Sequence, residues 1–166
     1  MELMEAIRKR RSIRRYKPDP VPEEKIRHVL EAARLAPSWA NRQCWRYIIV
    51  TDEALKREIT MRDWAAQAPV IIVGCADPRR SGTRADKQYY LLDMGISMEH
   101  LILAATEQGL GTCWIGGQFD EEAVKEALGI PEEIRVVALV SVGYPDEEPE
   151  PKTRKSLEEI TSRNQW

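Results

Sequence analysis

The stretch Pro69-Val-Ile-Ile-Val-Gly-Cys-Ala76 decides the fold class, because it is apolar at nearly every position. A half-solvated strand alternates apolar and polar residues, whereas a continuous apolar run predicts a strand buried on both faces. Two further stretches predict strands, residues 45–51 (WRYIIVT) and residues 134–143 (IRVVALVSVG). We therefore expect a sheet that other elements cover on both sides.

Helical patterns alternate with these strands. Pro22 opens one helix, which has two glutamates in its first turn and an apolar stripe of Ile26, Val29, Leu30 and Ala33. Further helices are expected at residues 2–10, 53–65, 85–108, 120–128 and around 156–161. The helix at 85–108 is apolar nearly all round, which indicates a central or intersubunit position. The expected architecture is a three-layer α/β/α sandwich in a single domain, residues 1–166.

Composition narrows the classes of protein. The 166 residues carry a net charge of −2, no apolar run approaches the ~18 residues of a membrane span, and the chain begins with no signal peptide. Three cysteines lie far apart, which favours reduced thiols and a cytoplasmic protein without a membrane partner. Only His28 and His100 are present, which argues against a histidine-built zinc site and against Ser-His or Cys-His catalysis.

Seven positive charges crowd into ten residues, 8–17. Arg10, Ser12 and Arg14 alternate, so an extended segment would point them to one side, where two guanidiniums flanking a hydroxyl suit a phosphate. Lys152 and Arg154 repeat the pattern near the other end. The alternatives are a solvated helix end, whose cations complement the helix dipole, and a solvated tail. Nucleic-acid binding is disfavoured, because the net charge is acidic and the basic patch is isolated.

Two loops could hold a flat ligand. Residues 36–45 (APSWANRQCW) offer donors and acceptors to a ring with several carbonyl and nitrogen positions, or merely connect a helix to a strand. Gly109-Leu-Gly111 follows a helix rather than a strand, and the sixth position is Trp114, which argues against a dinucleotide fingerprint. Glycines around Trp114 would let the main chain approach a ligand closely, or simply end a helix before a core strand.

In order and spacing, four motifs together resemble those of the nitroreductase family of FMN-dependent oxidoreductases. They are R-R-S-x-R at residues 10–14, A-P-S-x-x-N-x-Q at 36–43, G-L-G-T-x-W-x-G at 109–116 and K-x-R at 152–154. The resemblance implies an α+β fold with a central mixed, largely antiparallel sheet. It also implies a domain-exchanged homodimer with FMN at the subunit interface, in which the tail 145–166 reaches over the partner protomer.

The resemblance also assigns site residues. The FMN phosphate would be bound by Arg10, Arg11, Ser12, Arg14, Lys152 and Arg154. The other protomer would supply Ser38 and Asn41, with Pro37 and Gln43 nearby. The main chain along the flavin ring would be that of Thr112, Cys113, Trp114, Ile115 and Gly116. The sequence departs from the motif at Cys44, where the family often has proline.

The activity implied is reduction of nitroaromatics, quinones or similar flat acceptors by NAD(P)H, through ping-pong hydride transfer at flavin N5. Because the flavin carries this chemistry, no catalytic side chain and no metal are expected. Other reactions of the same fold, reductive dehalogenation or flavin cleavage, remain alternatives, as does a flavin-binding module without turnover. In larger members of the family, segments that cover the flavin lie between the positions of Trp64 and Arg84, and here they are missing or reduced. The resemblance therefore does not imply which acceptor is reduced.

Overall fold

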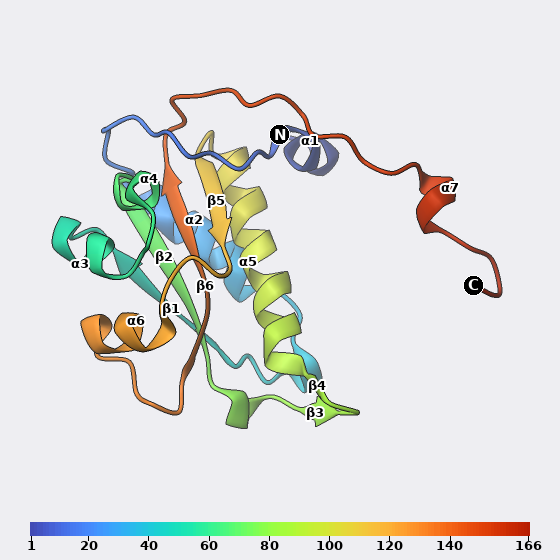
Figure 1. Cartoon of the computed structure of the whole chain (residues 1–166). Coiled ribbons are helices and arrows are strands. Elements are labelled where there is room, and N and C mark those ends of the chain that lie inside the picture. Colours follow the sequence, from blue (N-terminus) through green and yellow to red (C-terminus); the bar gives the residue numbers. More distant parts are fainter.

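A four-stranded antiparallel sheet lies at the centre of the computed structural model, which describes residues 1–166 (Figure 1). Its strands run in the order β1-β2-β6-β5, and their bounds are Trp45–Val50, Val70–Ala76, Arg135–Gly143 and Gly111–Ile115. All seven residues of β2 are buried, so the strand buried on both faces is confirmed. Every pairing in the sheet is antiparallel, and the single parallel contact is a bridge between Ser12 and Thr112.

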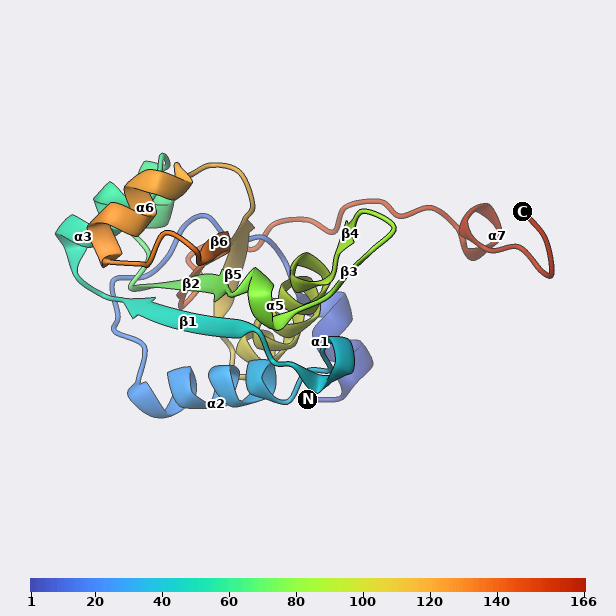
Figure 2. The ribbon, with the colours of Figure 1, turned by 90° about the horizontal axis from the view of Figure 1, so that it is seen from below.

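Helices cover both faces of this sheet, as Figure 2 shows. The first face carries α2 (Glu23–Arg34) and α5 (Tyr89–Glu107), with α1 (Leu3–Lys9) packed against α5. The opposite face carries α3 (Glu53–Glu58), α4 (Asp63–Ala66) and α6 (Glu121–Leu128). Each side has its own buried cluster, of 17 and 10 residues respectively. The three-layer α/β/α arrangement is therefore confirmed.

The single helix expected at 53–65 is wrong, because the chain leaves the helix at Ile59. The Met61 N–H donates to the carbonyl of Gln118 at 3.1 Å, and the Arg62 N–H donates to Thr60 Oγ1 at 3.2 Å. These bonds turn the backbone toward the loop after β5, and a second short helix, α4, begins at Asp63. A contact distant in sequence thus overrides a continuous helical pattern.

The expected start of the long helix at residue 85 is also wrong, since α5 begins at Tyr89. Residues 83–88 instead form a small hairpin, β3 (Thr83–Arg84) and β4 (Lys87–Gln88), after a 3-10 turn at Pro78–Arg80. Ala85 and Asp86 turn this hairpin with φ of 49° and 63°. Two successive positive φ angles are what a two-residue hairpin turn requires, and they exclude the helix there.

Segments from the two ends of the chain run side by side above the sheet (Figure 1). The Lys17 N–H donates to the Tyr144 carbonyl at 2.9 Å, and the Asp146 N–H donates to the Arg15 carbonyl at 2.9 Å. The Ile13 N–H donates to Thr112 at 2.8 Å, and a Cβ at Gly111 would lie 2.8 Å from the Ile13 side chain. Glycine at position 111 therefore lets the first segment lie directly on β5.

Beyond residue 149 the chain extends away from the sheet and ends near α7 (Leu157–Ile160), which lies apart from the body in Figure 1. Ser156 and Glu159 form a capping box at its start. The large apolar side chains of this arm, Leu157, Ile160 and Trp166, are exposed. None of the helices combines the length and apolar character that crossing a bilayer requires.

An ion pair joins α6 to β6. Arg135 donates to both carboxylate oxygens of Glu121, at 2.8 and 2.9 Å, and the Val136 N–H donates to Glu121 Oε1 at 2.9 Å. These bonds, with the Arg135 hydrogen bond as the largest cause, lower the pKa of Glu121 below its usual 4.5. The folded state therefore gains stability above the unfolded pKa and loses it as the pH falls through the folded pKa.

Glu121→Gln should lower the free energy of unfolding at pH 7 by about 1–2 kcal/mol, because it removes charge-assisted hydrogen bonds. It should also make unfolding less sensitive to acid below pH ~4.5. Urea unfolding at pH 7 and at acid pH measures both effects. Glu122→Gln is the matched control, because Glu122 is 79% exposed and such pairs contribute little. Equal effects of the two variants would contradict this assignment.

Candidate functional site

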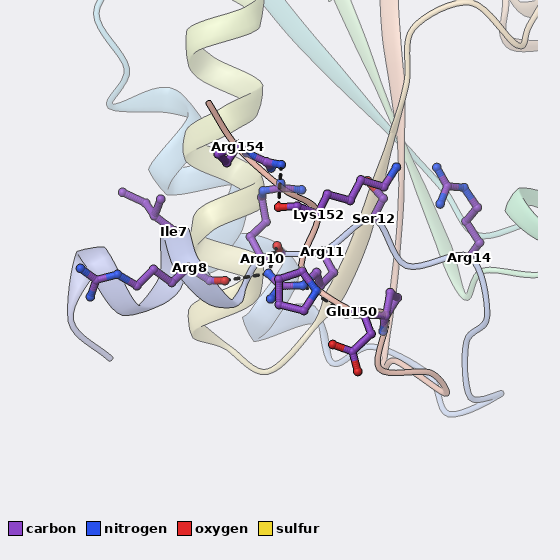
Figure 3. A pocket seen from close by; sticks show the side chains of 11 residues that line it. Ile7, Arg8, Arg10, Arg11, Ser12, Arg14, Glu150, Lys152 and Arg154 are labelled. Carbon is purple, nitrogen blue, oxygen red and sulfur yellow. Dashed lines mark hydrogen bonds between the residues drawn. The ribbon is translucent and has the colours of Figure 1, made fainter. Parts of the chain in front are cut away.

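A cavity of about 690 Å³ lies between the basic segment, residues 8–17, and the start of the C-terminal arm, residues 145–166. Figure 3 shows the side chains of Arg10, Ser12, Lys152 and Arg14 pointing to one side, whereas Arg8 reaches away. The expected alternation along residues 10–14 is thus present, and the two basic clusters meet. The lining residues are Ile7, Arg8, Arg10, Arg11, Ser12, Arg14, Pro149, Glu150, Pro151, Lys152 and Arg154.

The cations at this cavity lack carboxylate partners. Arg10, Arg14, Lys152 and Arg154 form no ion pair, although Arg15 beside them pairs with Asp146 at 3.6 Å. The guanidinium of Arg154 donates only to nearby carbonyls, of Lys152 at 3.2 Å and Thr153 at 3.0 Å. Like charges held together repel, so this cavity favours a compact polyanion, to which arginine can donate two hydrogen bonds at once.

Arg11 joins the two segments. Its guanidinium donates to the carbonyls of Arg8 at 2.7 Å, Arg10 at 2.8 Å and Pro149 at 3.2 Å. The structure therefore shows Arg11 fixing the main chain that carries the other cations. A direct contact between Arg11 and a phosphate stays a prediction.

Two other groups hold the basic segment in place. Glu147 accepts hydrogen bonds from the backbone N–H groups of Arg14 and Arg15. The Tyr16 hydroxyl donates to the Ile13 carbonyl at 2.6 Å and lies 2.8 Å from Ser141 Oγ. Burial raises the pKa of Tyr16, so the hydroxyl stays protonated and keeps this bond.

A second cavity of about 560 Å³ adjoins the first, and Arg14 lines both. The Arg14 guanidinium lies 5.6 Å from the centre of the Trp64 ring, within the range of a cation–π contact. Cys113 to Gln118 line the rest, together with Arg62. Burial raises the pKa of Cys113, which keeps its thiol protonated. Thr112 is buried and pairs with the basic segment instead of lining the cavity.

Sequence reasoning missed three residues here. Arg62 and Trp64 line the second cavity, and Glu147 supports the first. Neither Arg62 nor Trp64 had a signal, because they lie in residues 60–67 (TMRDWAAQ), which mix apolar and polar side chains as an ordinary helix does. Glu147 had none, because it is one of several acidic residues in the tail.

The loop 36–43 lies elsewhere, beside the amino end of α5 and the hairpin β3–β4. Its centre is a 3-10 turn at Trp39–Asn41, and Ser38 Oγ accepts a hydrogen bond from the Gln43 N–H at 2.9 Å. The four residues expected to contact a ligand, Pro37, Ser38, Asn41 and Gln43, line neither cavity. Within one chain the structure therefore does not bring this loop to the cations, and its contact with a ligand bound to a second protomer stays a prediction.

Known proteins match the chain over most of its length. The family model described as Nitroreductase matches residues 7–63 and 61–144. An NADH dehydrogenase of Thermus thermophilus is 36% identical, over 93% of this chain and 92% of its own.

Two solved structures share the fold. A nitroreductase family protein of Clostridium novyi NT has a TM-score of 0.84 and 38% identity, over 92% of this chain and 89% of that one. An FMN-dependent nitroreductase of Clostridium difficile R20291 has a TM-score of 0.87 and 29% identity, over 98% and 99%. The matched residues include all four strands of the central sheet, and the four sequence motifs are present as well. The chain therefore belongs to the nitroreductase family.

Proposed function

We propose that this chain reduces flat aromatic acceptors, such as nitroaromatics or quinones, in a ping-pong reaction with NAD(P)H. As a member of its family the chain is an NAD(P)H-dependent flavin oxidoreductase, and FMN is its cofactor. The carrying observation is the cluster of unpaired cations at a cavity that adjoins, through Arg14, a second cavity lined by main chain. The flavin supplies the hydride chemistry when bound.

The residues present fit this cofactor. A phosphate dianion needs compensating positive charge when it leaves water. The cavity offers four cations that form no ion pair within the chain, Arg10, Arg14, Lys152 and Arg154. Ser12 adds a hydroxyl, and its backbone is fixed by the bridge to Thr112. Arg11 and Glu147 hold this framework without occupying the space.

The second cavity suits the ring. Cys113 to Gly116 follow one another along β5 and the turn after it, so their main chain can lie against a flat group. Trp64 packs against the second buried cluster and has the Arg14 guanidinium 5.6 Å from the centre of its ring, which fixes Arg14 between the two cavities. Nicotinamide and acceptor would occupy the same place beside the flavin ring in turn.

The site is complete only in a homodimer. Leu91, Leu92 and Ile96 of α5 are exposed, and so are Met4 and Ile7 of α1, which packs against α5. An apolar surface of this kind marks an interface. A second copy docked there would bring its loop 36–43 toward the cations of the first, and the arm 145–166 would reach over the partner.

Arg14→Ala combined with Arg154→Ala should weaken FMN binding by several kcal/mol, because each charge-assisted contact contributes about 1.5–3 kcal/mol. Titration of flavin fluorescence with the apoprotein measures the dissociation constant. Arg27→Ala combined with Arg57→Ala removes the same charge from exposed positions on α2 and α3 and should change little. Unchanged affinity in the first pair would refute the phosphate assignment.

Mixing the FMN-loaded protein anaerobically with NADH or NADPH should bleach the visible flavin band, and a nitroaromatic or quinone added next should restore it. Turnover of both acceptors is compared with that of a halophenol. Return of the band only with the halophenol as final acceptor would favour dehalogenation. A band unchanged by both nucleotides would make the protein a flavin carrier without turnover.

Leu92→Asp should convert the dimer to a monomer, because it places a charge in the apolar interface. Size-exclusion chromatography with light scattering measures the mass. The side chain of Leu92 is 52% exposed in the single chain, and that of Met61, on the opposite face of the sheet, is 64% exposed. Met61→Asp is therefore the matched control and should remain dimeric. A dimeric Leu92→Asp variant would exclude α5 as the interface.

A further inference from the structure

Asp93 is a buried carboxylate in an apolar helix. Its side chain is 3% exposed, and it is the only charged residue between Tyr89 and Met98 of α5. It has no cationic partner. Instead it accepts hydrogen bonds from the Trp39 N–H at 2.8 Å, from Ser81 Oγ at 3.2 Å and from Cys44 Sγ at 3.6 Å. Burying a charge costs free energy, so these three donors are what hold it there.

Two of the donors bracket a strained segment. Trp39 and Cys44 flank residues 40–43, of which Ala40, Asn41 and Gln43 have φ of 47°, 53° and 48°. Asparagine tolerates this left-handed region, whereas alanine and glutamine adopt it at a cost in free energy. Such a backbone persists only where its surroundings fix it, and Asp93 fixes it at both ends.

The third donor adds the hairpin. Ser81 precedes Gly82, where a Cβ would lie 2.6 Å from the Trp39 indole, and Trp39 stacks on Tyr89 with ring centres 6.0 Å apart. The Tyr89 N–H donates in turn to the Gly82 carbonyl at 2.9 Å. The loop, the hairpin base and the start of α5 are therefore packed into one unit around Asp93.

We propose that Asp93 is a positioning residue, which holds Ser38 and Asn41 in the orientation that meets the ring and ribityl chain of FMN bound to the partner protomer. This inference rests on the proposed function. Cys44 takes part through its thiol, at the position where the sequence departs from the family motif. Where the family often has a proline, whose ring makes the main chain rigid, this chain has a cysteine whose thiol donates a hydrogen bond to the buried carboxylate of Asp93.

The thiol remains a donor at neutral pH. Burial, first of all, and the negative charge of Asp93 raise the pKa of Cys44 to about 11. The sulfur therefore keeps its proton, and its bond to Asp93 persists across the physiological range.

The test compares two flavins as probes, FMN and riboflavin, which differ only in the phosphate. Cys44→Ala combined with Ser81→Ala removes two of the three donors and should raise the dissociation constants of both flavins by the same factor, roughly tenfold. Cys44→Ser keeps a donor and should restore most of the affinity. By contrast, the Arg14→Ala and Arg154→Ala pair should weaken the binding of FMN much more than that of riboflavin, because Arg154 faces only the phosphate cavity and two of the four cations there are lost.

Cys75→Ala is the matched control, because Cys75 is another buried thiol, on β2 away from this loop. It should change the free energy of unfolding but neither flavin's dissociation constant. Cys44→Ala and Ser81→Ala are also made singly, so that a folded variant lacking one bond is measured even where the double variant does not fold.

The outcomes separate the two hypotheses. A wild-type dimer that binds neither flavin overturns the proposed function and this inference with it. The positioning role alone is overturned if the wild-type dimer binds FMN and the Cys44→Ala and Ser81→Ala variants bind both flavins as tightly as the wild type does. Weakened binding of FMN but not of riboflavin would also overturn it, since the loop would then act at the phosphate.

Discussion

The antiparallel contact between residues 11–17 and residues 144–149 is the interaction on which the candidate site depends. It brings together cations that are more than a hundred residues apart in the sequence, against their mutual repulsion. Main-chain hydrogen bonds, the Glu147 carboxylate and the burial of Ile13 provide the opposing free energy. None of these groups forms an ion pair with the cations that face the cavity, because Glu147 bonds to backbone N–H groups instead. The positive charges at the cavity therefore stay unpaired.

The sheet determines where this contact lies. Thr112 at the start of β5 pairs with Ser12, and β5 pairs with β6, whose end leads directly into Tyr144. One end of the sheet thus carries the cavity lined by cations. The loop around Ser38 lies at the amino end of α5, where Asp93 holds it. The proposed site would combine the cations of one chain with the loop of another, because the two lie apart within a single chain.

Elements with a strong local pattern could be predicted from the sequence. The bounds predicted for β2 from its apolar run and for α2 from its apolar stripe were correct to within a residue or two, because burial alone determines these two patterns. The break at Ile59 could not be predicted, since it depends on a bond from Met61 to Gln118, and neither could the turn at Ala85, a residue that rarely adopts positive φ. The motif assigned Arg11 to the phosphate, but only coordinates reveal its bonds to three carbonyls. Asp93 could not be singled out from the sequence, because α5 also carries Glu99 and Glu107 and nothing in the sequence names the donors that Asp93 meets.

Under the proposed function, the unpaired cations would also link the stability of the fold to the supply of its cofactor. Without an anion, their repulsion acts against the very contact that joins the two ends of the chain. A ligand that binds only the folded state stabilises it by mass action, by about 2.7 kcal/mol at a hundredfold excess over its dissociation constant. Flavin supply in the cell would then set how much of the chain is folded and protected from proteases. Under the same proposal, chains made without flavin would unfold more readily and would be degraded first.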